Sequence, residues 1–421
     1  MSVGDRRRVI RALARDYVAT TLVQWFVLGA GLFLFHLVAA VGGVGGFAYY
    51  QIARGVVSTF QPLATGGLVQ GLQRYLPRIS TSAGAERTAR SAFAVQAGAA
   101  GVFALAGVAL SPWADRFLGL PGGASSVVAT MVLLTGTCLC TVTVAALRGT
   151  HQVVHANVVA GAGLGLVPLA AIQMTDSVER FLILQGAGAA VVAVAGMLTV
   201  RGRTVPHPGK PEPTFINLLS YGAKRLPADM ALPALFTYPT LVVAAARPGG
   251  GEAGYVGFVT SAITLICSLF GTLSPVLLPR LSRMFHRSGH DGHTLRILTS
   301  LPVLAGALAA VAAVTIALAA PYLIRGFLGP EFHAAVRVLH VGIFAAVPLA
   351  MFYAARPTLD ALPEPPRLNR LLLGCLTLQV LLTHAAMTVL SPEYAALAAM
   401  AAAATVLGIR SVSLVERALT T

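Results

Sequence analysis

The chain has 421 residues, of which 56% are hydrophobic and only 11% are charged, and its formal net charge is +15. Soluble domains carry about 25% charged residues, so this composition, with a mean hydropathy of +0.77, excludes a soluble globular protein. The positive charge by itself would suggest nucleic-acid binding, but membrane proteins accumulate Lys and Arg in their cytoplasmic loops, so we expect no nucleic-acid partner.

Apolar runs predict an all-α integral membrane protein with about twelve transmembrane helices, because a run of roughly 20 apolar residues crosses a bilayer. The first run is followed by many others, so we do not expect it to be a cleaved signal peptide. We place the spans near 19–41, 47–74, 91–112, 124–146, 153–173, 179–200, 215–246, 253–279, 295–320, 333–355, 367–390 and 394–415.

Cations are concentrated in every second loop of this arrangement, whereas the loops between them are short and poor in cations. An even number of spans places both termini on one side, and the positive-inside bias predicts that this side is the cytoplasm. The cations on the predicted cytoplasmic side are Arg6, Arg7, Arg8, Arg11, Arg15, Arg78, Arg87, Arg90, Arg201, Arg203, Lys210, Arg280, Arg283 and Arg287.

A short motif near the end of the second span returns near the end of the eighth. "YLPRIS" (Tyr75–Ser80) and "LLPRLS" (Leu277–Ser282) lie about half a chain apart, and each span follows a Gly-rich outer turn, "GGVGGFAYY" or "GGGEAGYVG". Six spans per half would leave the halves parallel, as in transporters built from parallel repeats. We therefore predict an N-terminal six-helix lobe (1–205), a Pro-rich cytoplasmic linker (206–214) and a C-terminal six-helix lobe (215–421).

The second span contains a cation inside an apolar segment. If its helix starts near Phe47, Arg54 lies about 10 Å inside it, and Gln51, three residues earlier, shares its face. Ionisable groups are costly in lipid and therefore indicate a cavity. The alternative is a helix that begins near Val56, with Arg54 reaching the outer interface. Further along, Pro62 and three glycines allow bending, and Gln61 supplies a polar contact.

The seventh span opens with "YGAKRLPADMALPALFTYP". If it begins near Ile216, Lys224 and Arg225 lie within it, and Asp229 lies four residues after Arg225 on the same face. The alternative places the membrane edge at Leu226, so that both cations mark the cytoplasmic boundary. Arg225 and Asp229 can neutralise each other, in which case Lys224 supplies the remaining positive charge of this segment. Three prolines in this span predict a bent or broken helix.

No motif of a hydrolase, metalloprotease or nucleotide-binding enzyme is found in the sequence, and the four cysteines lie in apolar runs, where they are interpreted as small buried hydrophobes. We therefore expect no enzymatic activity and no cofactor. The suspected cavity helices carry several cations and one acid, a balance that favours an anionic substrate such as a diphosphate headgroup.

The stretches "LATGGLVQGLQRYLPR", "YGAKRLPA" and "GYVGFVTSAITLICSLFGTLSPVLLPRLSRM", together with the twelve predicted spans, resemble the polysaccharide-transporter (O-antigen flippase) family of the multidrug/oligosaccharidyl-lipid/polysaccharide exporter superfamily. The resemblance implies a V-shaped, two-lobed bundle whose central cavity is lined by the first, second, seventh and eighth spans. It implies a bacterial plasma-membrane flippase that moves a polyprenyl-diphosphate-linked oligosaccharide to the outer leaflet by alternating access. Membrane lipids and glycan polymerase or assembly proteins are the expected partners, and Arg54, Lys224 and Arg225 are the expected diphosphate ligands.

Two other branches of the superfamily compete with the flippase family. A membrane enzyme such as a glycan polymerase or ligase is a further alternative, but it would need an external loop with catalytic groups, and the sequence shows none. The lipid II flippases of the superfamily usually have fourteen spans, which this chain lacks. The multidrug exporters have twelve, but their coupling depends on buried acids in the first and seventh spans. Here the first span offers only Asp16, at its edge, so an ion-coupled exporter of organic cations would have to use Asp229.

Overall fold

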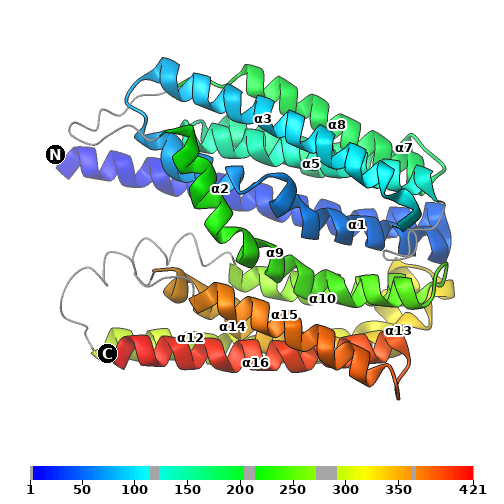
Figure 1. The fold of residues 1–421 in the computed structure, drawn as a ribbon. Helices are drawn as coiled ribbons and strands as arrows, with labels where there is room; N and C mark the ends of the chain where they lie inside the picture. The colour runs from blue at the N-terminus through cyan, green and yellow to red at the C-terminus, as the bar shows by residue number, and fades with distance from the viewer. Residues whose placement is uncertain (1–2, 114–122, 203–213, 272–291, 362–366, 421) are drawn as a thin grey trace. The chain divides into compact units, whose positions relative to one another are not determined.

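The computed structural model describes residues 3–113, 123–202, 214–271, 292–361 and 367–420 (Figure 1). Every regular element in these ranges is a helix, mostly α-helix with short 3₁₀ turns (η1, η3, η4) and one π-helical turn (η2). The elements are α1 (Val3–Ala64), α2 (Leu68–Tyr75), η1 (Leu76–Arg78), α3 (Ser82–Ala109), α5 (Ala124–Gly149), α6 (Val153–Gly161), η2 (Ala162–Leu166), α7 (Val167–Gln173), α8 (Val178–Leu198), α9 (Phe215–Ala246), α10 (Glu252–Gly271), α12 (Gly292–Phe327), η3 (Pro330–Phe332), α13 (Ala335–Gly342), η4 (Ile343–Ala345), α14 (Ala346–Ala361), α15 (Arg367–Ala386) and α16 (Pro392–Thr420).

Among the described residues, 11 helical segments are long and apolar enough to cross a membrane. The first of them, Val18–Ala64, contains the first predicted span and the larger part of the second, 47–64, and each of the other predicted spans overlaps one of the remaining segments. The two spans are joined at Gly43, whose φ of 56° and ψ of −159° are not helical. The predicted all-α, multi-pass membrane fold is confirmed.

The described residues form two compact units, and the units differ from the predicted lobes in two segments. Gly43–Gly55, the start of the second span, belongs to the second unit, and Phe215–Leu226, the start of the seventh span, belongs to the first. Most of the predicted linker, 206–213, lies outside the described residues, as does the second copy of the repeated motif, Leu277–Ser282. The lobe boundaries, the parallel repeat and the V-shaped arrangement stay predictions.

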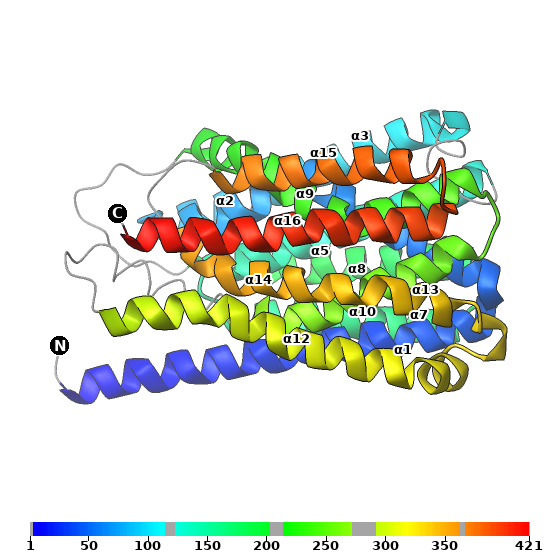
Figure 2. The same cartoon turned by 90° about the horizontal axis from the view of Figure 1, so that it is seen from below.

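In the first unit, α5 packs against both α3 and α8 (Figure 1). The α5–α8 contact is backbone to backbone, because a Cβ on Gly136 would lie 1.9 Å from the carbonyl oxygen of Gly186. Small residues allow helices in a membrane to approach this closely, which increases their van der Waals contact. In the second unit, α14 likewise packs against both α12 and α16 (Figure 2).

The second span is broken, where the sequence predicted only bending. Its helix ends at Ala64 and restarts at Leu68, and the intervening Gly66 and Gly67 have φ of 54° and 73°. The fully buried Gln96 of α3 donates from Nε2 to the carbonyl oxygen of Ala64 at 3.1 Å. Glycine adopts the left-handed conformation without steric penalty, and the glutamine satisfies a carbonyl that the break leaves without its helical partner.

The seventh span is continuous, so the prolines do not break it. α9 runs without interruption through Pro227, Pro233 and Pro239. Proline's fixed φ is compatible with a helix, and the cost arises from the lost donor and the local clash. Breakage therefore depends on whether other groups satisfy the freed carbonyls.

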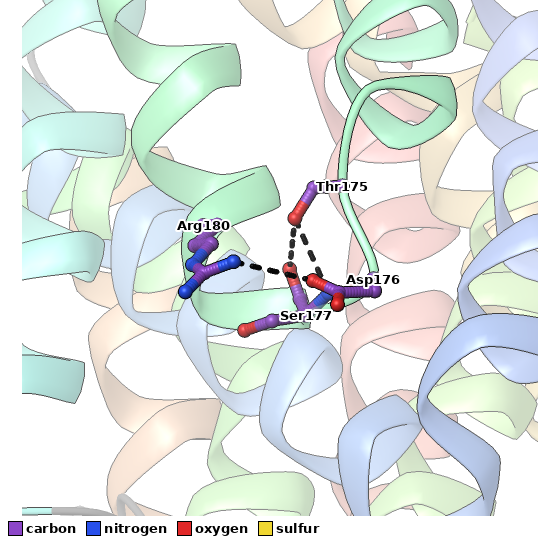
Figure 3. A network of polar contacts seen from close by, with 4 residues as sticks. All are labelled: Thr175, Asp176, Ser177 and Arg180. Carbon is purple, nitrogen blue, oxygen red and sulfur yellow. Dashed lines mark hydrogen bonds and ion pairs between the residues drawn. The ribbon is translucent and has the colours of Figure 1, made fainter.

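The loop between α7 and α8 is as short as the sequence predicted (Figure 3). The hydroxyl of Thr175 accepts from the backbone N–H of Ser177 at 3.2 Å. Asp176 and Arg180 form an ion pair at 3.4 Å whose side chains are 88% and 74% exposed. Exposed ion pairs contribute about 0–1 kcal/mol, so this pair has little structural weight and Arg180 is a useful control position.

Candidate polar site on the second and eighth spans

The part of α1 that follows Gly43 packs along a row of glycines at the start of α10, the first of which directly precedes the helix, within the second unit. The spacing of three residues along α10 and of three or four along α1 keeps the contact on one face of each helix. A Cβ on each glycine would lie 2.2 to 3.0 Å from an α1 atom, in the pairs Gly251 with Val44, Gly254 with Ala48 and Gly257 with Gln51. The side chain of α1 that lies one turn beyond Gln51 is therefore held against the turn of α10 that follows Gly257.

That side chain is Arg54. Its Nη1 donates to the hydroxyl oxygen of Ser261 at 3.0 Å and to Oε1 of Gln51 at 3.4 Å. Ser261 in turn donates to the carbonyl oxygen of Gly257 at 2.7 Å, which fixes the position of its hydroxyl. Both partners of Arg54 in these bonds are neutral, so the bonds orient the guanidinium without cancelling its charge.

Gln51 is 4% exposed, and its Nε2 has no hydrogen-bond partner in the described part of the chain. Leaving a buried donor unsatisfied costs about 1–3 kcal/mol, so such a group calls for an acceptor. Its own Oε1 accepts from Arg54. Two kinds of donor, an amide and a guanidinium, are thus joined at one place.

The helix is continuous on both sides of Arg54, from beyond Gly43 to Ala64. Arg54 lies about three turns past Gly43, or roughly 16 Å along the helix axis. The alternative of a helix beginning near Val56 is therefore wrong. The arginine side chain is half-buried, between the buried positions Ala53 and Val56. Whether it lines a cavity stays a prediction.

The other predicted residues are divided between the two units. Gln61 donates from Nε2 to the hydroxyl of Thr141 on α5 at 3.0 Å, so its amide contributes to packing in the first unit. Lys224 and Arg225 also belong to the first unit, where Arg225 donates to the hydroxyl of Tyr221 at 3.4 Å. Asp229 belongs to the second unit. The predicted pairing of Arg225 with Asp229 stays a prediction.

Ser261 is the residue of this site that the sequence reasoning missed. The signal was present in "GEAGYVGFVTS", where three glycines repeat every third residue and the serine follows four residues after the last. Such a row of small residues on one helical face indicates a close helix partner. A polar residue that continues such a row, as Ser261 does, therefore faces the partner helix and can bond to a polar side chain there, in this case Arg54.

No protein-family model and no curated protein matches the chain. Solved structures match it along almost its whole length, at low identity. A structure of a multidrug resistance MATE family transporter of the MOP superfamily in its inward-facing conformation matches with a TM-score of 0.73 and 13% identity over 96% of this chain and 98% of that one. The lipid II flippase MurJ, in an inward closed conformation, matches with a TM-score of 0.68 and 13% identity over 96% and 88%.

A third match is a MOP superfamily transporter from Pyrococcus furiosus, whose structure is described under a title that reports reverse polarity of its binding pocket. Its TM-score is 0.53 and its identity 14%, over 97% of this chain and 95% of that one. At such identities the matches establish the fold alone. The chain has the fold of transporters of this superfamily.

Proposed function

We propose that the protein is a transporter that moves a polyprenyl-diphosphate-linked oligosaccharide from the cytoplasmic to the outer leaflet of a bacterial plasma membrane by alternating access. Both termini lie in the cytoplasm in this proposal, as the distribution of cations predicts. The lipid-linked glycan is the cargo, and glycan polymerase or assembly proteins are the expected partners. The fold shared with transporters and with a lipid flippase supports this class of activity.

The observation that carries the proposal is the pairing of Arg54 with Gln51. A guanidinium within an apolar helix is expensive unless it meets water, a polar wall or an anion. Beside it stands a buried amide donor that lacks an acceptor within the described residues. A diphosphate would supply acceptor oxygens to both donors, and the planar fork of arginine matches phosphate geometry.

The charge balance of the helices also supports an anionic cargo. Arg54, Lys224 and Arg225 are accompanied by Asp229 as the one acid between Phe215 and Ala246. A site built for organic cations requires the opposite balance. The competing exporter reading therefore depends on Asp229 alone.

The test is transport in proteoliposomes with a fluorescent polyprenyl-diphosphate oligosaccharide, measured as its transfer between leaflets. Arg54→Ala should slow transfer by at least roughly tenfold, because it removes a charge that the cargo would pair with. Arg54→Lys should be intermediate, since it keeps the charge and loses the fork. Arg180→Ala, at an exposed ion pair, is the control and should transfer at the wild-type rate.

A parallel arm uses a fluorescent organic cation with Asp229→Asn. If Arg54→Ala transferred the glycan lipid normally, while wild type exported the dye and Asp229→Asn did not, the protein would be a cation exporter and the proposal would be wrong.

A further inference from the structure

A second polar feature lies in the first unit, where α2 crosses the start of α9. A Cβ on Gly67 would lie 2.3 Å from the Cα of Gly222, and one on Gly71 would lie 2.7 Å from the carbonyl oxygen of Leu218. The two helices therefore meet backbone to backbone. As a result, the side chains at the end of α2 and in η1 are carried next to those of α9.

These side chains form an arginine–tyrosine cluster, made of Arg74, Tyr75, Arg78, Tyr221 and Arg225. The two tyrosine rings meet edge to face, with centroids 5.7 Å apart. The guanidinium of Arg74 lies 4.3 Å from the ring centroid of Tyr221, and that of Arg78 lies 5.3 Å from the ring centroid of Tyr75. Arg225 donates to the Tyr221 hydroxyl at 3.4 Å, so three cations surround one pair of rings.

The charges of Arg74 and Arg78 are exposed and, in the part of the chain that the structure describes, have no ion-pair partner. Both side chains are exposed, and no carboxylate within the described ranges forms an ion pair with either of them. By contrast, Arg90, on the same predicted side of the membrane, pairs with Glu86 at 2.6 Å. Cation–π contact at an exposed site contributes only about 0.5–1 kcal/mol and leaves the positive charge in place.

The surroundings fit a lipid headgroup better than a dissolved ion. α2 is amphipathic: Leu68 and Leu72 are buried, whereas Gln73 and Arg74 are exposed. Tyrosines are enriched at membrane–water interfaces, and basic clusters between helices on the cytoplasmic side bind anionic headgroups. Stacking on the rings holds the guanidinium groups in place, which lowers the entropy lost when a phosphate binds.

We propose that the arginine–tyrosine cluster is a binding site for the phosphate of an anionic membrane lipid. The site shares Arg225 with the cations counted for the cargo, but Arg74 and Arg78 are not among those cations and the site needs no transported cargo, so it goes beyond the proposed function. It would anchor the junction of the second and seventh spans to the cytoplasmic leaflet.

The test is native mass spectrometry of the full-length protein, titrated with phosphatidylglycerol. Arg74→Ala/Arg78→Ala should weaken retention of the lipid by roughly tenfold or more, because two charge-assisted contacts are lost. Arg74→Lys/Arg78→Lys should weaken it less. The control is Arg87→Ala/Arg90→Ala, which removes the same charge from the same predicted side without touching a tyrosine, and it should retain the lipid as wild type does.

If both double alanine variants lost phosphatidylglycerol equally, the lipid would be held by general positive charge, and the proposal would be overturned. So would normal retention in Arg74→Ala/Arg78→Ala. A third arm adds inorganic diphosphate to the wild-type complex. Displacement of phosphatidylglycerol by an equal concentration of diphosphate would mean that the cluster recognises a free phosphate group, and the lipid assignment would be wrong.

Discussion

Gln379 of α15 donates a hydrogen bond from Nε2 to the backbone carbonyl oxygen of Leu235 in α9, at 3.0 Å. This carbonyl has no helical partner, because the residue four positions later is Pro239, which lacks an N–H. Gln379 is fully buried. A side chain from a distant part of the sequence thus completes the hydrogen bonding of a proline-containing helix and explains how α9 passes Pro239 without a break.

Replacing this glutamine should destabilise the protein through that carbonyl. We expect Gln379→Leu to lower the free energy of unfolding by about 1–3 kcal/mol, because a buried acceptor loses its partner. Pro239→Ala restores an N–H that can bond to Leu235, so the same Gln379→Leu change should cost about 1 kcal/mol less in that background. Thermal unfolding of the four proteins in detergent measures the difference, and equal costs in both backgrounds would show that the hydrogen bond is unimportant.

The two glycines at the break of the second span should differ in their tolerance of alanine. Gly66 and Gly67 both have positive φ, but a Cβ on Gly66 would meet nothing within 4 Å, whereas one on Gly67 would press on the backbone of Gly222. Gly66→Ala should cost about 1–2 kcal/mol for the left-handed conformation alone. Gly67→Ala should lower the free energy of unfolding clearly more, because its Cβ also meets the backbone of Gly222. Unfolding midpoints compare them directly, and similar losses would contradict the close crossing of α2 and α9.

The glycine row of α10 should be required for the position of Arg54. A Cβ on Gly257 would lie 2.6 Å from the Cβ of Gln51, so Gly257→Ala must push the two helices apart. We expect it to weaken retention of a polyprenyl-diphosphate lipid about as much as Arg54→Ala does. Gly271→Ala, on the same helix, meets Tyr353 at an ordinary 3.5 Å and should leave retention unchanged. Native mass spectrometry with the lipid is the readout. If Gly257→Ala retained the lipid normally, the close contact between α1 and α10 would not be needed to position Arg54.

Arg247 should matter more for stability than the exposed Arg180. Its Nη1 lies 3.0 Å from Oε1 of Glu252 and 3.3 Å from Oε2 of Glu393, and Glu393 is only 8% exposed. Arg247→Ala leaves a largely buried carboxylate with less compensation. Because the arginine itself is 40% exposed, we expect a loss of about 1–3 kcal/mol, below that of a fully buried pair.

Arg180→Ala is the matched control and should lose no more than about 1 kcal/mol. Glu393→Gln should recover part of the loss in the Arg247→Ala protein, since it removes the uncompensated charge. Chemical or thermal unfolding measures all three. If Glu393→Gln made that protein still less stable, the cost would come from lost packing and the ion pair would not be its cause.

Much of the architecture followed from hydropathy alone. The predicted spans 153–173 and 215–246 coincide with Val153–Gln173 and Phe215–Ala246. The turn between the first two spans lies within the glycine-rich stretch that the sequence marked, at Gly43. These features depend on residues close together in the chain, because the transfer of an apolar segment from water to lipid is set by its own composition.

The details of the helices were harder to predict. Pro62 and its neighbouring glycines suggested bending, and the structure has a break at Thr65–Gly67. Three prolines suggested a bent or broken seventh span, and of these two alternatives the break is wrong, because α9 is continuous. Proline and glycine show where a helix can deform. Whether it breaks depends on the partners of its freed carbonyls, such as Gln96 and Gln379, which are supplied by other helices.

The sequence by itself therefore determined that this is a multi-pass helical membrane protein, approximately where most of its spans lie, and that Arg54 and Gln51 share a helical face. Only the tertiary structure decided the hydrogen-bond partners of these side chains: Arg54 donates to Ser261, Gln61 to Thr141 and Arg225 to Tyr221. The physical reason is that hydropathy acts on each segment separately. Which faces meet depends on close glycine contacts and on hydrogen bonds between segments far apart in the chain.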